Sequence, residues 1–133
     1  MIGKNDFMIH VCFSLHDKSG RYSKFTGTAI LSIFENTNSP VTVHILHDPT
    51  LTADNRDKFI SLAGRYSQAV KFYNVEEFCS KELKDIVAFF PAVKNHYATV
   101  GMFYRFLLPQ ILPDDIDKCI YHDSDILHVE QKK

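Results

Sequence analysis

The chain has 133 residues, 45% of them hydrophobic and 23% charged, and a formal net charge of -1. These values predict a single folded domain over residues 1–133 and exclude a disordered chain or two ordinary domains. The balanced charge gives no electrostatic basis for binding nucleic acid, and no apolar run has the length of a transmembrane segment. The three cysteines, Cys12, Cys79 and Cys119, show no zinc or disulfide spacing and indicate a reducing cytoplasm.

Strands and helices are predicted to alternate through the first part of the chain. Runs of apolar and β-branched residues indicate strands, and apolar residues at a spacing of three to four indicate helices. Thr52 has the character of a helix N-cap. In chain order these patterns predict a strand at 7–15, a helix from about 23 or 24 to 36, a strand at 41–47, a helix at 54–65 and a short strand at 70–75.

The pattern is looser after residue 75. It indicates a helical turn at 75–78, a short helix at 80–90, and an apolar helical segment at 95–109 that contains Arg105. A last strand is predicted to begin at Lys118 and to end at Asp123. Strands that alternate with helices predict an α/β fold with a mostly parallel sheet, in a Rossmann-like three-layer sandwich.

Three predicted strands end in a histidine followed by an aspartate: His16-Asp17, His47-Asp48 and His122-Asp123. The carboxyl ends of parallel strands lie at one edge of the sheet, where α/β domains bind their ligands. Asp48 precedes a proline, so we expect it to form a turn, and His47 is expected to be structural. The loop after Asp17 contains groups able to contact a base, a ribose or a phosphate, although a solvated loop is an equal alternative.

Two carboxylates, Asp123 and Asp125, follow the last strand with one residue between them. Two acids this close repel each other unless a cation or a proton is shared. A hard divalent ion that also binds a phosphate would satisfy both of them. By itself this pattern is more often a solvated turn. Arg105, on a mostly apolar helix, is expected to pair with an anion such as Asp123 or a ligand phosphate. The alternative is an amphipathic helix whose arginine reaches solvent.

These motifs, in this order, resemble the nucleotide-sugar-binding half of glycosyltransferase family eight, which has the GT-A fold. That family includes bacterial lipopolysaccharide galactosyl- and glucosyltransferases and glycogenin. The resemblance covers nearly the whole chain. The residues that carry it are the helix from Thr28 to Asn36, the Val43-His44-Ile45-Leu46 strand, Tyr104-Arg105-Phe106-Leu107-Leu108-Pro109, and the segment from Asp117 to Leu127.

The resemblance implies a retaining hexosyltransferase that uses a UDP-sugar donor and a saccharide or lipid-linked glycan acceptor, as in lipopolysaccharide biosynthesis. Asp123 and Asp125 match the D-x-D pair that binds Mn²⁺ or Mg²⁺, and Ser124 places its backbone near the nucleotide. Arg105 matches an arginine that contacts the donor sugar and diphosphate. The residues that match the strand and loop holding uracil and ribose are Ser14, His16 and Asp17.

The sequence also departs from the family pattern. The first loop is usually more acidic than His16-Asp17-Lys18-Ser19. In the family, a later segment supplies a histidine to the metal and a lysine to the phosphates. A fold truncated after the D-x-D strand is therefore expected to bind donor weakly and to have little activity. Two alternatives stay open: a non-catalytic α/β module, and a metal-dependent nucleotidyltransferase, which would need a glycine-rich loop where Gly20 is the only glycine.

Overall fold

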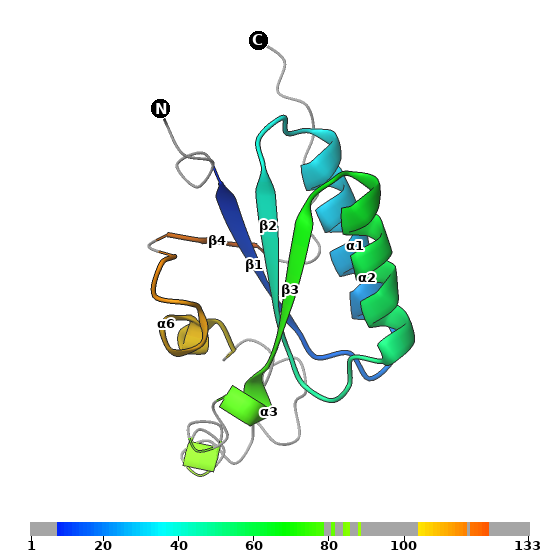
Figure 1. Cartoon of the computed structure of the whole chain (residues 1–133). Helices are drawn as coiled ribbons and strands as arrows, with labels where there is room; N and C mark the ends of the chain where they lie inside the picture. Colours follow the sequence, from blue (N-terminus) through cyan, green and yellow to red (C-terminus); the bar gives the residue numbers. More distant parts are fainter. Residues whose placement is uncertain are drawn as a thin grey trace.

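A four-stranded parallel sheet forms the centre of the protein (Figure 1). The computed structural model describes residues 8–78, 81, 84, 85, 88, 104–116 and 118–122. The strands follow the order β3-β2-β1-β4, and all neighbouring pairs are parallel. The predicted α/β fold is confirmed. The strands are β1 (Ile9–Leu15), β2 (Val41–His47), β3 (Ala69–Asn74) and β4 (Ile120–Tyr121).

Helices cover both faces of this sheet. The two long helices, α1 (Arg21–Glu35) and α2 (Ala53–Arg65), lie together on one face (Figure 1). Three short elements pack at the other face: α3 (Val75–Phe78), the 3-10 helix η3 (Tyr104–Leu107) and α6 (Leu108–Ile111). No helix among the described residues is long and apolar enough to cross a membrane.

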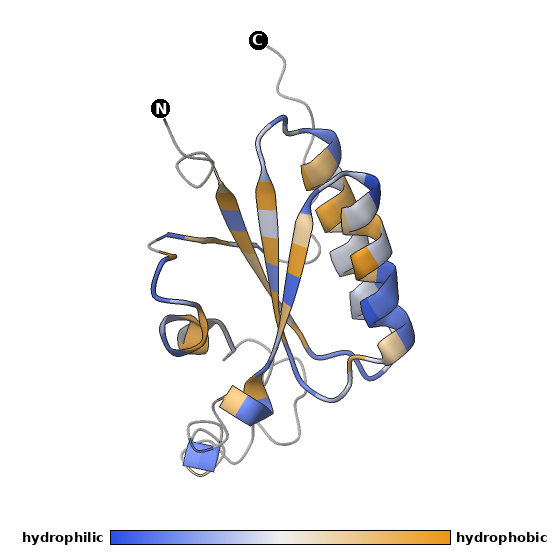
Figure 2. Ribbon diagram, viewed as in Figure 1, coloured by the Kyte–Doolittle hydropathy of each residue, from blue (hydrophilic) through white to orange (hydrophobic). Residues whose placement is uncertain are grey.

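The larger core lies between the sheet and the two long helices. Along β1, alternate side chains point to these helices, and the β-branched residues of β2 do the same because a strand has a two-residue period. In Figure 2, apolar segments alternate with polar ones along β1, β2 and β3, and α1 and α2 carry both kinds of residue. The buried residues of this core are Val11, Phe13, Leu15, Ala29, Ile30, Ile33, Phe34, Val41, Val43, Ile45, Phe59 and Ala63.

The opposite face of the sheet is more polar. Its apolar core is small and joins Leu46, Tyr73 and Val75 to residues of η3 and α6. Beside it runs a chain of hydrogen bonds: His10 Nδ1 to His44 Nε2 at 2.9 Å, and His44 Nδ1 to the Tyr73 hydroxyl at 2.9 Å. The His44 side chain is completely buried, so these contacts provide the partners that a buried imidazole requires.

Helix α1 begins earlier than predicted, at Arg21. The residue before it, Gly20, has a φ of 85°, a left-handed conformation that glycine adopts without strain. The capping group comes from further upstream, because the Asp17 carboxylate accepts hydrogen bonds from the backbone N–H groups of Tyr22 (3.2 Å) and Ser23 (2.8 Å). A search for a cap next to the helix therefore misses this start.

The apolar segment predicted as a helix at 95–109 is interrupted where it is described. Residues 104–107 form η3, and α6 then starts at Leu108 with Pro109 in its first turn. A continuous α-helix would clash at Pro109, whose ring meets the carbonyl four residues earlier and which has no N–H to donate. Residues 95–103 lie outside the described part, as do most of 80–90, of which 81, 84, 85 and 88 are helical.

Strand β4 is also shorter than predicted. It contains Ile120 and Tyr121, which pair with Val11 and Cys12, and the N–H of His122 donates to the Cys12 carbonyl at 2.9 Å. Cys119 precedes the strand and is half-buried, whereas Cys12, in β1, is fully buried. The last predicted strand is therefore short, and within the described part of the chain it lies at the edge of the sheet.

The predicted N-cap of α2 is confirmed, because the Thr52 hydroxyl accepts from the Asn55 N–H at 3.1 Å. Thr52→Ala is expected to lower the free energy of unfolding by about 1 kcal/mol, since one N–H at the helix start loses its partner. Urea unfolding followed by circular dichroism measures this loss. Thr28→Ala, at an exposed position inside α1, is the matched control and should be neutral or slightly stabilising. Equal effects at the two sites would contradict the capping role.

Candidate nucleotide-sugar site

The polar ends of three adjacent strands mark the candidate site. In the order β2-β1-β4 these strands are neighbours, and because they are parallel their carboxyl ends lie at one edge. The expected convergence is confirmed for two of the ends, since His16 Nδ1 is hydrogen-bonded to Asp48 Oδ2. The third strand, β4, ends at Tyr121; His122 follows it, and Asp123 comes next in the sequence.

Among the described carboxylates of this edge, Asp48 accepts the most hydrogen bonds. Its Oδ1 accepts from both the backbone N–H (2.9 Å) and the hydroxyl of Thr50, which forms the predicted turn. Its Oδ2 accepts from His16 and from the Tyr104 hydroxyl, the latter at 2.5 Å. Burial alone would raise the pKa of Asp48, but the hydrogen bonds from Thr50, Tyr104 and His16 outweigh burial and lower it. The group is therefore an anion at neutral pH.

Tyr104 is the buried partner of this anion, with 2% of its surface exposed. Burial and the hydrogen bond to Asp48 raise the pKa of the Tyr104 phenol. The hydroxyl therefore stays protonated and donates a hydrogen bond to the carboxylate. Sequence reasoning missed this contact, and it assigned Asp48 only a turn. The available signal was a tyrosine in an apolar segment, because a buried phenol hydroxyl usually has a partner.

The predicted uracil and ribose residues have structural contacts of their own. The Asp17 carboxylate caps α1, and the Asp17 N–H donates to the Thr50 hydroxyl at 2.6 Å. His16 contacts Asp48, as described above. Ser14 lies on β1, half-buried, and its Oγ has no hydrogen-bond partner within the described part of the chain. The structure thus brings the three residues to the end of β1.

The other predicted residues lie partly or wholly outside the described residues. Asp123, Ser124 and Asp125 are outside them, and of Arg105 only the backbone, within η3, is described. Among the residues that are described, no three His, Cys, Asp or Glu side chains form a group able to hold a metal ion. His122 is described: it is buried, and its ring lies 5.1 Å from the Phe13 ring.

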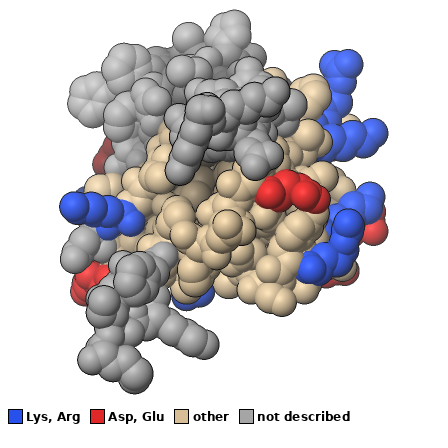
Figure 3. Space-filling model, turned by 90° about the horizontal axis from the view of Figure 1, so that it is seen from above, with Lys and Arg blue, Asp and Glu red and all other residues tan. Residues whose placement is uncertain are grey.

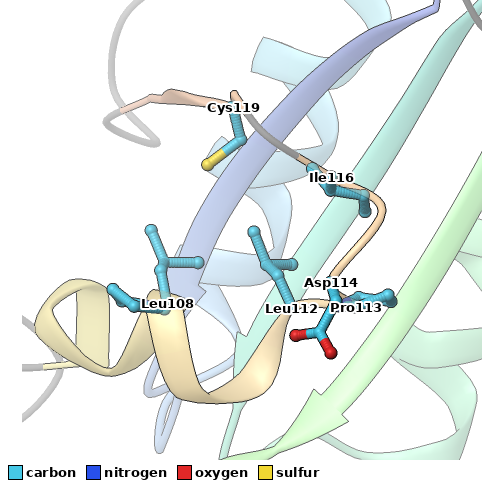
Figure 4. Close-up of a pocket in the computed structure, with 7 residues that line it drawn as sticks. Leu108, Leu112, Pro113, Asp114, Ile116 and Cys119 are labelled. Carbon is cyan, nitrogen blue, oxygen red and sulfur yellow. The ribbon is translucent and has the colours of Figure 1, made fainter.

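Among the described residues, neither the surface charge nor a cavity marks the candidate site. On the face in Figure 3, basic and acidic side chains of the described residues lie close to one another and form no wide patch of one sign. A cavity of about 390 Å³ lies beside α6 and contains none of the predicted site residues (Figure 4). In Figure 4, Leu108 and Leu112 point towards Cys119 across this cavity. Its lining is formed by Leu108, Pro109, Leu112, Pro113, Asp114, Ile116 and Cys119.

A parallel sheet with helices on both faces, and polar groups at the carboxyl ends of its strands, defines an α/β domain of the nucleotide-binding type. Comparison with known families gives the assignment. The family model for glycosyl transferase family 8 matches residues 12–132, so the chain belongs to this family.

Comparison with solved structures agrees with the family. The fold is similar to that of mouse xyloside xylosyltransferase 1 in its apo form, with a TM-score of 0.56 and 17% sequence identity. The similarity covers 92% of this chain and 45% of the mouse chain, so the chain spans less than half of that protein. At this identity the likeness shows the GT-A fold. No curated protein sequence matches the chain.

Proposed function

We propose that this chain is the donor-binding part of a retaining hexosyltransferase that uses a UDP-sugar. The observation that carries the proposal is the family match over residues 12–132 together with the position of β4. This strand lies next to β1, and the chain leaves it towards the Asp123-Ser124-Asp125 motif. The motif therefore follows the strand adjacent to β1, which carries Ser14 and is followed directly by His16 and Asp17.

Asp123 and Asp125 would hold a divalent ion, Mn²⁺ or Mg²⁺. Two carboxylates separated by one residue are the hard oxygen ligands that such ions prefer, and they supply two of the positions that an octahedral ion needs. When bound, the ion supplies positive charge to a diphosphate leaving group. The Arg105 guanidinium would add a second, fixed positive charge, and the Ser124 backbone would lie beside the nucleotide.

The proposed acceptor is a saccharide, either a glycan or a lipid-linked glycan of the lipopolysaccharide type. It rests on the membership of family 8. Location in a reducing cytoplasm stays a prediction from the cysteine pattern.

Calorimetric titration with UDP tests the proposal. In the presence of Mn²⁺ the chain is expected to bind UDP saturably, and removal of the ion with EDTA should weaken binding by about tenfold or more, since metal and diphosphate charges interact directly. Asp123→Ala should cause a similar loss. The control is Asp114→Ala, an exposed acid nine residues upstream.

Two outcomes would overturn the assignment. One is that the wild-type chain binds no UDP at concentrations up to several millimolar. The other is that UDP binds equally well with and without Mn²⁺ and equally well in Asp123→Ala. A non-catalytic α/β module, whose acids at the strand ends serve only structure or partner contact, predicts no effect of Mn²⁺ on thermal stability. A folded state for each variant is checked by its thermal unfolding transition.

A further inference from the structure

The contact between Asp48 and Tyr104 joins two segments that are 56 residues apart in the sequence. Both side chains are buried, with exposed fractions of 4% for Asp48 and 2% for Tyr104. Taking a carboxylate out of water is costly unless hydrogen bonds satisfy it, and a hydrogen bond to a charged group is stronger than one between neutral groups. The contact therefore holds η3 firmly to the end of β2.

The same carboxylate also reaches the loop after β1. His16, the first residue of that loop, contacts Oδ2, the oxygen that accepts from Tyr104. Thr50 contacts Oδ1, and its hydroxyl accepts from the N–H of Asp17 in the same loop. Asp48 thus joins three segments: the loop after β1, the loop after β2, and η3.

A turn alone does not account for this arrangement. The turn after β2 uses only Oδ1, through the two contacts from Thr50. Both contacts to Oδ2 come from segments distant in the sequence. Oδ1 therefore stabilises the local turn, whereas Oδ2 makes tertiary contacts to two other segments.

We infer that Asp48 is a positioning residue, which fixes η3, the element that carries Arg105, against the loop after β1. Tyr104 is the link, because Arg105 follows it directly in η3. The consequence for binding rests on the proposed function, in which Arg105 and this loop contact the two ends of one donor. A displacement of about 1 Å between groups that bind one ligand is enough to weaken their joint action severely.

Hydrogen exchange tests the attachment of η3 without any ligand. In Tyr104→Phe and in Asp48→Asn, the backbone amides of residues 104–108, 110 and 111 are expected to exchange at least about tenfold faster, while those of α2 keep their rates. The matched controls are Tyr22→Phe and Asp57→Asn, which change the same groups at exposed positions. Unchanged rates at 104–111 in Tyr104→Phe would overturn the inference, as would an equal acceleration throughout the sheet and both helices.

A double-mutant cycle tests the link to the donor. Tyr104→Phe is expected to weaken UDP binding in the presence of Mn²⁺ by about fivefold in the wild-type background. In an Arg105→Ala background it should weaken binding less than about twofold, because the residue acts through Arg105. Equal factors in the two backgrounds would overturn the inference.

The two measurements separate the possible failures. If the wild-type chain binds no UDP, the proposed function and the donor link are both overturned, and hydrogen exchange still decides whether Asp48 holds η3. If UDP binds normally and Arg105→Ala alone weakens it, the proposed function stands and the positioning role of Asp48 is overturned.

Discussion

Phe13→Ala is expected to lower the free energy of unfolding by about 3–5 kcal/mol, a large share of the roughly 5–15 kcal/mol that stabilises an ordinary domain. Phe13 is fully buried in the middle of β1, in the core under α1 and α2. Its ring also packs against His122, directly after β4. Because its side chain points to the helices, the cavity would open between β1 and these helices, beside the His122 ring.

Thermal or urea unfolding of the variant measures this effect. A loss of this size lowers the melting temperature by about 10–20 °C for a domain of this length. Phe25→Ala is the matched control, since it removes the same atoms from a side chain on α1 that is 49% exposed. We expect a change within about 0.5 kcal/mol there. Similar losses for the two variants would contradict the described core.

The free energy of unfolding is expected to fall by about 3 kcal/mol as the pH is lowered from 7.5 to 4, with His44 as the main cause. Burial, then the charges of His10 and Lys71, lower the pKa of His44 to about 4 from its ordinary value of 6.5. Between pH 6.5 and pH 4, the unfolded chain binds a proton on His44 that the folded chain does not bind. Stability therefore decreases as the pH falls through this window, and it is unaffected by His44 above it.

Two neighbouring groups also change the free energy of unfolding with pH. His10 acts in the same direction as His44, and Asp48 acts only below about pH 4. The pKa of His10 is lowered as well, by burial, then by Lys71, against a smaller opposing effect of Asp115. The lowered pKa of Asp48 adds a loss that begins as the pH falls below the ordinary aspartate value of about 4, because a depressed carboxyl pKa stabilises the fold only above that range. The loss between pH 6.5 and 4 is thus a histidine effect.

Urea unfolding at pH 7.5, 6.5, 5.5 and 4.5 checks the expectation. His44→Gln should remove most of the slope, whatever it does to stability at pH 7.5. The control His47→Gln changes a buried histidine on the other face of β2 and retains His44, so its slope should match that of the wild type. A flat wild-type profile, or a full slope in His44→Gln, would show that His44 is not responsible.

The sequence predicted the regular elements well because their patterns are local. The run from Val41 to His47 is β2 to the residue, and Thr52 caps α2 as its hydroxyl and position indicate. The errors lie at the ends of helices, where a residue outside the helix or a proline determines where the helix starts or stops. Helix α1 is capped by Asp17 from outside the helix, and Pro109 divides a stretch whose apolar spacing alone is helical.

The candidate site was predicted in part. The parallel sheet allowed the meeting of His16 with the end of β2 to be predicted, since strand ends of one sheet share an edge. The role of Asp48 was not, because its turn contact with Thr50 is local while its contact with Tyr104 depends on how η3 packs. A sequence pattern predicts local contacts, such as that with Thr50, but not contacts that depend on tertiary packing, such as that with Tyr104.

The pairing of β4 with β1 has a consequence for how the protein is made. Val11 pairs with Ile120, so the partner of β1 on this side is synthesised about 110 residues later, which takes roughly 5–20 s at ordinary rates of translation. During that time β1 can pair with β2 alone and its outer edge is open. An open strand edge is a template for pairing with other chains. The segment that leads into the D-x-D motif therefore also closes this edge, and among the described strands β4 is synthesised after the other three.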